Sequence, residues 1–154
     1  MRKIVRSALF AATCLGSLPT IAVPSLAVDT MTSADAPDLT SVRTKIKAKD
    51  YIGALTELRT LADTYQHPDV YSLMGFSLRK TGDYTTALTF YKKALDFDAD
   101  HKGAREYLGE LYVETGELPQ AREQLAVLTK LCPQGCEERE DLEKALASAS
   151  QKRN

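Results

Sequence analysis

Apolar and small residues recur with helical spacing along the middle of the chain. One stretch places its apolar residues three and four positions apart, on a single helix face: Tyr84, Ala87, Leu88, Tyr91, Ala94 and Leu95. The order of glycine and alanine in this region then returns after 34 residues, because Gly75, Gly82 and Ala87 recur as Gly109, Gly116 and Ala121. A period of this length predicts an all-α chain of paired helices, in which each pair buries its apolar face against its neighbours.

The two copies resemble the tetratricopeptide repeat (TPR) family, because large and small residues alternate at that family's packing positions. They depart from its pattern at Arg105, where a bulky apolar residue usually opens the unit, and at Ala99, where a proline usually closes it. The resemblance implies a TPR-type α-solenoid. The residues that carry it are Tyr71, Met74, Gly75, Leu78, Gly82, Tyr84, Ala87, Tyr91, Ala94 and Phe97 in the first copy, and Leu108, Gly109, Tyr112, Gly116, Leu118, Ala121, Leu125, Leu128, Leu131 and Pro133 in the second.

Three repeats and one final helix account for the chain after its N-terminal segment. We expect the repeats at about 38–67, 68–101 and 102–135, followed by a capping helix at about 137–150. The first repeat is degenerate, since its turn lacks a glycine and is one residue shorter, as is common for a terminal repeat with one face in water. The capping helix has its own apolar stripe of Leu142, Ala145, Leu146 and Ala149.

The N-terminal segment has the three parts of an export signal. Arg2, Lys3 and Arg6 precede an apolar stretch over residues 7–18, which is too short to span a bilayer. Small residues at Ser25 and Ala27 then form a cleavage site. We therefore predict a signal peptide over 1–27, a flexible leader over 28–37, and a periplasmic or secreted protein without membrane insertion after cleavage.

The charge balance argues against a nucleic-acid partner. Charged residues make up 27% of the chain, with both signs interspersed, and the formal net charge is −1. Loss of Arg2, Lys3 and Arg6 with the signal peptide leaves 17 basic against 21 acidic side chains, or −4. A mildly acidic chain without a basic stripe is a poor match for nucleic acid or an anionic membrane.

Two cysteines remain after cleavage, Cys132 and Cys136, around a turn that contains Pro133 and Gly135. In an oxidising compartment, a pair this close is interpreted first as a structural disulfide. A redox-active pair usually has two intervening residues in a thioredoxin-like context, and a metal site needs further ligands nearby. These two interpretations remain as alternatives.

The sequence contains no recognisable catalytic constellation. No serine or cysteine stands near a histidine in a pattern typical of a nucleophile and its base. Asp96, Asp98 and Asp100 alternate like the start of a calcium loop, but His101 and Tyr107 occupy the glycine and bidentate-glutamate positions. We therefore expect a protein that is not an enzyme, without cofactor or bound metal.

The TPR resemblance implies that the first helix of each repeat lines a concave face. Carried over to this chain, the positions that face a ligand are Lys47, Ser72, Phe76, Arg79, Glu106 and Glu110. Phe76 is the expected exposed aromatic anchor, and Arg79 is expected to face the concavity beside it. The groove would be basic on one side and acidic on the other.

These features together predict an exported, non-catalytic scaffold that binds a protein or peptide partner in its groove. One alternative is a thiol- or metal-handling periplasmic protein that uses Cys132 and Cys136. A second is a structural protein that assembles by stacking its terminal repeats. The sequence does not fix the oligomeric state.

Overall fold

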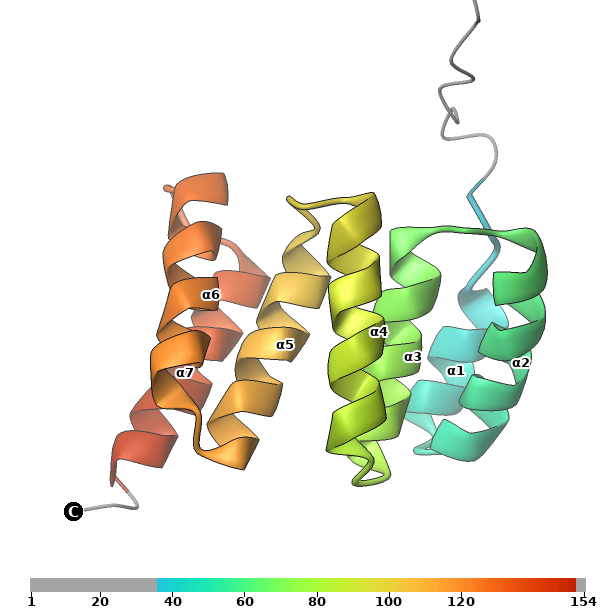
Figure 1. Cartoon of the computed structure of the whole chain (residues 1–154), viewed down its shortest axis with the longest axis horizontal. Coiled ribbons are helices and arrows are strands. Elements are labelled where there is room, and N and C mark those ends of the chain that lie inside the picture. The colour runs from blue at the N-terminus through green and yellow to red at the C-terminus, as the bar shows by residue number, and fades with distance from the viewer. Residues whose placement is uncertain (1–35, 152–154) are drawn as a thin grey trace, which may run out of the picture. The chain divides into compact units, whose positions relative to one another are not determined.

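The protein folds into an array of α-helices, seen in a computed structural model that describes residues 36–151 (Figure 1). The predicted signal peptide, its cleavage site and nearly all of the predicted leader lie outside the described residues. Within 36–151 there are seven helices and no strand, as the sequence pattern predicted. They are α1 (Thr40–Lys47), α2 (Tyr51–Thr64), α3 (Pro68–Lys80), α4 (Tyr84–Phe97), α5 (Lys102–Thr115), α6 (Leu118–Leu131) and α7 (Glu137–Gln151).

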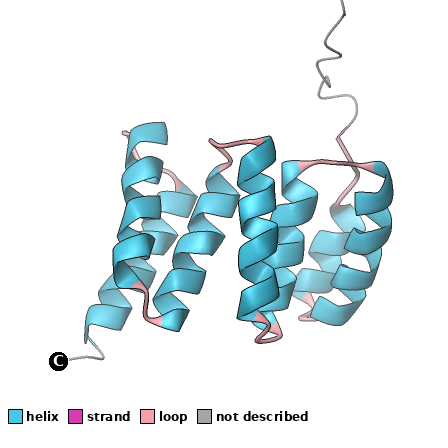
Figure 2. Ribbon diagram, in the orientation of Figure 1, coloured by secondary structure: helices cyan, strands magenta, loops and turns pink. Residues whose placement is uncertain are grey.

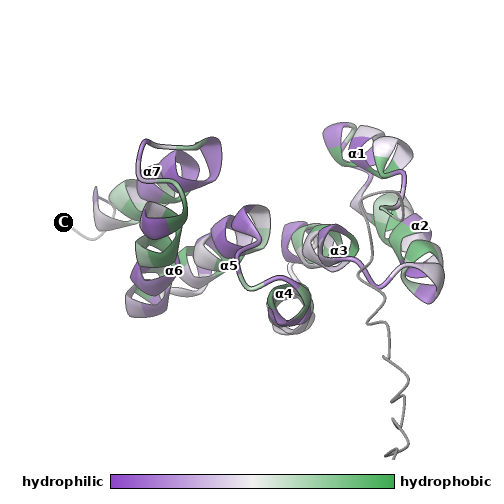
Figure 3. Ribbon diagram, turned by 90° about the horizontal axis from the view of Figure 1, so that it is seen from above, coloured by the Kyte–Doolittle hydropathy of each residue, from purple (hydrophilic) through white to green (hydrophobic). Residues whose placement is uncertain are grey.

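Each helix packs against the next one along the chain, and short turns connect them at alternating ends (Figure 2). Helix α3 also contacts α5, and α5 contacts α7. Seen from above, α1, α3, α5 and α7 follow one side of the array, whereas α2, α4 and α6 follow the other (Figure 3). The predicted all-α solenoid of helix pairs is therefore confirmed, and side chains from the odd-numbered helices share one side of it.

Capping side chains mark where α2 and α4 begin, and glycines with positive φ angles follow α3 and α5. The carboxylates of Asp50 and Asp83 cap α2 and α4 by accepting hydrogen bonds from backbone N–H groups at 2.9 Å and 3.1 Å. Gly82 and Gly116 have φ angles of +89° and +84°, in the left-handed region that glycine adopts most easily. They turn the chain back after α3 and α5, as the repeat pattern predicted.

Small residues of the repeat lie where a neighbouring helix inserts a large side chain. A Cβ atom on Gly75 would lie only 2.6 Å from the ring of Tyr91, which is fully buried between α3 and α4. Gly109 on α5 likewise lacks the Cβ atom that would overlap the side chain of Leu142 on α7. At both positions the missing side chain of glycine leaves the volume that a large side chain of a packed helix fills.

The last helix continues the repeat. Met74, Leu108 and Leu142 follow one another at 34-residue intervals, and all three are buried. Helix α7 therefore takes the place that the first helix of a further pair would occupy, with Leu142 and Leu146 against α5 and α6. Beyond covering the last repeat, it adds side chains to the side shared by α1, α3 and α5.

No helix among residues 36–151 combines the length and apolar character needed to cross a bilayer.

Candidate functional site

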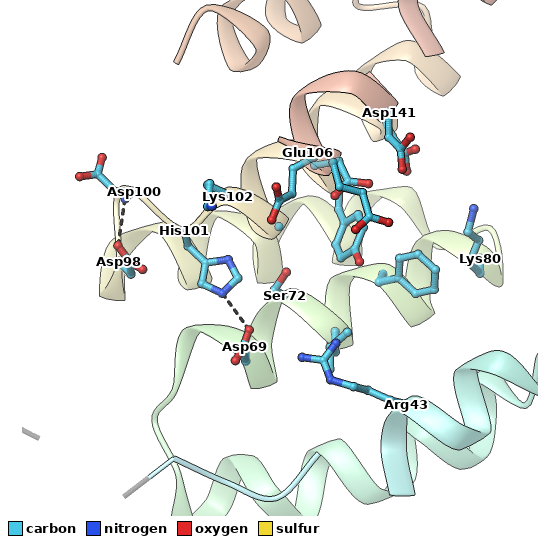
Figure 4. A pocket seen from close by; sticks show the side chains of 17 residues that line it. Arg43, Asp69, Ser72, Lys80, Asp98, Asp100, His101, Lys102, Glu106 and Asp141 are labelled. Carbon is cyan, nitrogen blue, oxygen red and sulfur yellow. Dashed lines mark hydrogen bonds and ion pairs between the residues drawn. The ribbon is translucent and has the colours of Figure 1, made fainter. Parts of the chain in front are cut away.

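A cavity of about 700 Å³ opens on the side shared by the odd-numbered helices (Figure 4). We call it the groove. Its walls come from α1, α3, α5 and α7 and from the turn before α5. The lining residues are Arg43, Asp69, Ser72, Leu73, Phe76, Lys80, Asp98, Asp100, His101, Lys102, Gly103, Glu106, Tyr107, Glu110, Glu137, Glu138 and Asp141.

The groove is predominantly acidic. Eight of its lining residues carry carboxyl groups, whereas three are lysine or arginine. Helix α7 contributes only acids, Glu137, Glu138 and Asp141, while α1 contributes the cationic Arg43. The basic side was predicted from Arg79, which does not line the groove; Arg43 and Lys80 are the positively charged lining residues of α1 and α3, and α3 also contributes the acidic Asp69.

Glu106 lies at the centre of the acidic wall. The residue is only 9% exposed, it lines the open cavity, and it forms no ion pair with any described residue. Burial raises the pKa of Glu106 to about 8, and the nearby carboxylates of Glu110, Asp141 and Glu138 act in the same direction. Near neutral pH this carboxyl group is therefore largely protonated.

Ser72 faces the same cavity from α3. The residue is 2% exposed, and its hydroxyl group has no hydrogen-bond partner among the described residues. A buried polar group without a partner is unfavourable, so its presence at a cavity wall calls for an explanation. In Figure 4 the side chains of Ser72 and Glu106 reach the cavity from the neighbouring helices α3 and α5.

A histidine–aspartate pair closes the end of the groove at the start of α5. His101 caps that helix, with its Nδ1 atom accepting a hydrogen bond from the Ala104 N–H at 3.0 Å. The Nε2–H can then donate to Asp69 Oδ1 at 2.9 Å (Figure 4), and this hydrogen bond lowers the pKa of Asp69. The pair ties the start of α3 to the start of α5.

Phe76 lies on the groove wall, as predicted, but in an aromatic cluster and only partly exposed. Its ring centroid is 4.9 Å from that of Tyr107 and 6.3 Å from that of Tyr51. The ammonium group of Lys80 lies 5.3 Å from the same ring. A smaller hollow of about 140 Å³ adjoins the ring and includes Lys47, another predicted site residue, in its lining.

The prediction that Arg79 faces the concavity is wrong. Its residue is 2% exposed, and its guanidinium group pairs with Glu110 and, at 2.6 Å, with Glu114. Both glutamates stand on the adjacent helix α5, one turn apart, so together they hold the planar fork of Arg79 between the helices. Glu110 both lines the groove and takes part in this pair, whereas Arg79 does not line the groove.

The structure places the two cysteines in the turn between α6 and α7. Their Cα atoms are 6.0 Å apart and their sulfur atoms meet, a separation that suits the predicted disulfide. Within residues 36–151, no group of three or more histidine, cysteine or acidic side chains is arranged to hold a metal ion. His67 and His101 instead cap α3 and α5.

Sequence reasoning missed the contribution of the last helix to the site. Of the α7 residues on the groove wall, Asp141 and Glu138 also act on the carboxyl group of Glu106. The signal was present, because Leu142 continues the 34-residue series of Met74 and Leu108. That register assigns α7 the same orientation as α3 and α5, with its non-packing residues toward the groove.

Comparisons with known proteins agree with the architecture. The model of a family described as tetratricopeptide repeat matches residues 78–146, from the end of α3 into α7. Among solved structures, the type III secretion translocator chaperone SycD of Yersinia enterocolitica is similar in fold, with a TM-score of 0.64 and 16% sequence identity. The similarity covers 77% of this chain and 97% of SycD. No curated protein sequence matches.

Proposed function

We propose that this chain, of which residues 78–146 match the tetratricopeptide repeat model, acts as an exported, non-catalytic scaffold that binds a segment of a partner protein in its groove. The observation that carries the proposal is the groove itself, which combines a partly exposed aromatic wall around Phe76 with an acidic wall around Glu106. A segment with an apolar residue and positive charges complements both walls. The similar fold of a protein described as a translocator chaperone supports a protein partner.

A partner bound in the groove should form crosslinks with residues that line the groove and not with residues on the other side of the protein. We expect a photo-crosslinking amino acid in place of Lys80, an exposed groove residue, to yield a crosslinked partner in the native compartment. The same amino acid in place of Ile52, which is 65% exposed on α2 and does not line the groove, is the matched control and should yield none. Equal capture at both positions would contradict binding in the groove.

Phe76→Ala should weaken binding of the captured partner by about 1–2 kcal/mol, because it removes the aromatic anchor of the groove. The substitution also removes contacts with Tyr107 and Tyr51, so it should lower the melting temperature as well. Ile52→Ala controls for loss of an apolar side chain outside the groove. Calorimetry at a temperature where both variants are folded separates the two effects, and unchanged affinity of Phe76→Ala would remove this residue from the site.

The export and disulfide parts of the proposal share one measurement. We expect the mature protein from its native compartment to begin at Val28, with an intact mass two hydrogen atoms below that of the reduced chain. Replacing Cys132 and Cys136 with serine should lower stability by about 2 kcal/mol or less, because the closed loop is very short. Hydrogen exchange should accelerate mainly in α7. A free dithiol or a bound metal in the native material would favour the thiol- or metal-handling alternative.

A further inference from the structure

The Ser72 hydroxyl is a buried polar group on the groove wall that has no hydrogen-bond partner within the described part of the chain, and the Glu106 carboxyl group on the neighbouring helix α5 has no ion-pair partner there. The Ser72 residue is 2% exposed and its hydroxyl group makes no hydrogen bond, and Glu106 is 9% exposed without an ion pair. Asp141 of α7 lines the same groove, and its charge acts on the carboxyl group of Glu106. Groups of this kind are stabilised when a ligand supplies the missing hydrogen bonds.

We propose that Glu106, Ser72 and Asp141 form a subsite that receives the side chain of a lysine or arginine from the bound segment. This inference rests on the proposed groove function and specifies the partner's chemistry. The carboxyl groups accept hydrogen bonds from an ammonium or guanidinium group, and the Ser72 hydroxyl offers a further acceptor. No lysine or arginine among residues 36–151 forms an ion pair with Glu106 or Asp141 other than Lys144, which binds Asp141 from the exposed side of α7.

The composition of the wall distinguishes a basic side chain from other ligands. An anion would meet the carboxylates of Glu110 and Asp141 in the same groove, which is unfavourable. A bare metal ion needs a set of converging ligands, and the described residues contain no such set. A basic side chain instead combines charge with an apolar stem, which the neighbouring rings of Phe76 and Tyr107 can cover.

Occupation of the subsite should be coupled to loss of a proton. The pKa of Glu106 is raised to about 8, and a cation placed beside the carboxyl group favours its ionised form. Binding should therefore release a proton near neutral pH and tighten as the pH rises from 6 to 9. The titratable and charged groups that face Glu106 are Glu110 on α5, Asp141 and Glu138 on α7, Asp69 and Arg79 on α3, Arg43 on α1, and Lys102 and His101 at the start of α5.

The test uses the full mature chain and short acetylated peptides in which leucine alternates with lysine. A neutral control peptide carries acetyl-lysine at the same positions. We expect the lysine peptide to bind about tenfold more tightly than its neutral control, and Glu106→Gln to remove most of this preference. Calorimetry in two buffers with different protonation enthalpies should detect proton release at pH 7.5 with the parent protein, but not with Glu106→Gln.

Two further variants keep the test specific. Ser72→Ala removes a hydroxyl group that has no partner, so it should leave the fold unchanged while weakening the lysine peptide several-fold. Glu123→Gln makes the same change of charge on an exposed residue of α6 outside the groove, and should alter neither affinity nor proton release. His101 also lines the groove, so comparison of the pH profiles of the parent protein and Glu106→Gln assigns the released proton to Glu106.

Three results would overturn the inference: no binding of the lysine peptide, equal binding of its neutral control, or an unchanged affinity and pH profile in Glu106→Gln. None of these three results contradicts the scaffold function if crosslinking at the Lys80 position still captures a partner. Loss of that crosslinking would contradict the scaffold function itself.

Discussion

Arg79→Ala should lower the free energy of unfolding by about 3 kcal/mol, because it removes the buried member of a charged cluster between α3 and α5. The side chain of Arg79 is 1% exposed, and it pairs with Glu110 and Glu114. Its loss leaves a cavity where the guanidinium group and its stem were packed. It also leaves Glu110, whose side chain is 24% exposed, without its cation. Urea denaturation followed by circular dichroism measures the change.

Two substitutions in the same cluster separate burial from charge. Arg79→Lys keeps the charge but loses the planar fork that contacts both glutamates, so it should fall between Arg79→Ala and the parent protein. Glu114→Gln removes a partner whose side chain is 37% exposed, and should cost about 0.5–1 kcal/mol. If Arg79→Ala were no more destabilising than Glu114→Gln, the cluster would not stabilise the contact between α3 and α5.

The cluster also illustrates what the repeat pattern can and cannot predict. The 34-residue period places Arg79 on the groove-facing helix α3, and this assignment to a helix is right. The period does not reveal that Glu110 and Glu114 of the next repeat stand within reach of the guanidinium group. A charge–charge contact between helices depends on side-chain length and on the separation of the helices, and neither follows from apolar periodicity.

The helical architecture was predictable because each contact that builds it lies within one repeat or between neighbours. Gly75 with Tyr91 is a pair of a small and a large residue within one repeat, and the sequence pattern predicts that pair. The burial and the pKa of the side chains that line the groove were not predictable in the same way. Glu106 was assigned to the groove from its register, but burial raises its pKa, and the carboxylates of Asp141 and Glu138 on α7 raise that pKa further.

The docking of α7 therefore matters for the groove as well as for stability. Leu142→Ala should lower the free energy of unfolding by about 3 kcal/mol, because it empties a fully buried site against α5. Hydrogen exchange should accelerate most in α7. The variant should also lower the pKa of Glu106, since Asp141 and Glu138 would no longer be held beside that carboxyl group. An unchanged exchange pattern in α7 would contradict this account.

Substitution of Gly109 tests the contact between α5 and α7 directly, because changes at Gly109 and Leu142 should compensate each other. A Cβ atom at residue 109 would overlap the side chain of Leu142, so Gly109→Ala alone should destabilise the protein by about 1–2 kcal/mol. In the Leu142→Ala background the overlap is gone, and the same change should instead stabilise by up to about 1 kcal/mol, since alanine favours a helix over glycine. Leu146→Ala is the matched background, because Leu146 is buried on the same helix but is not among the nearest neighbours of Gly109. There Gly109→Ala should remain destabilising, and a loss of stability of equal size in all three backgrounds would show that α7 does not dock through Gly109.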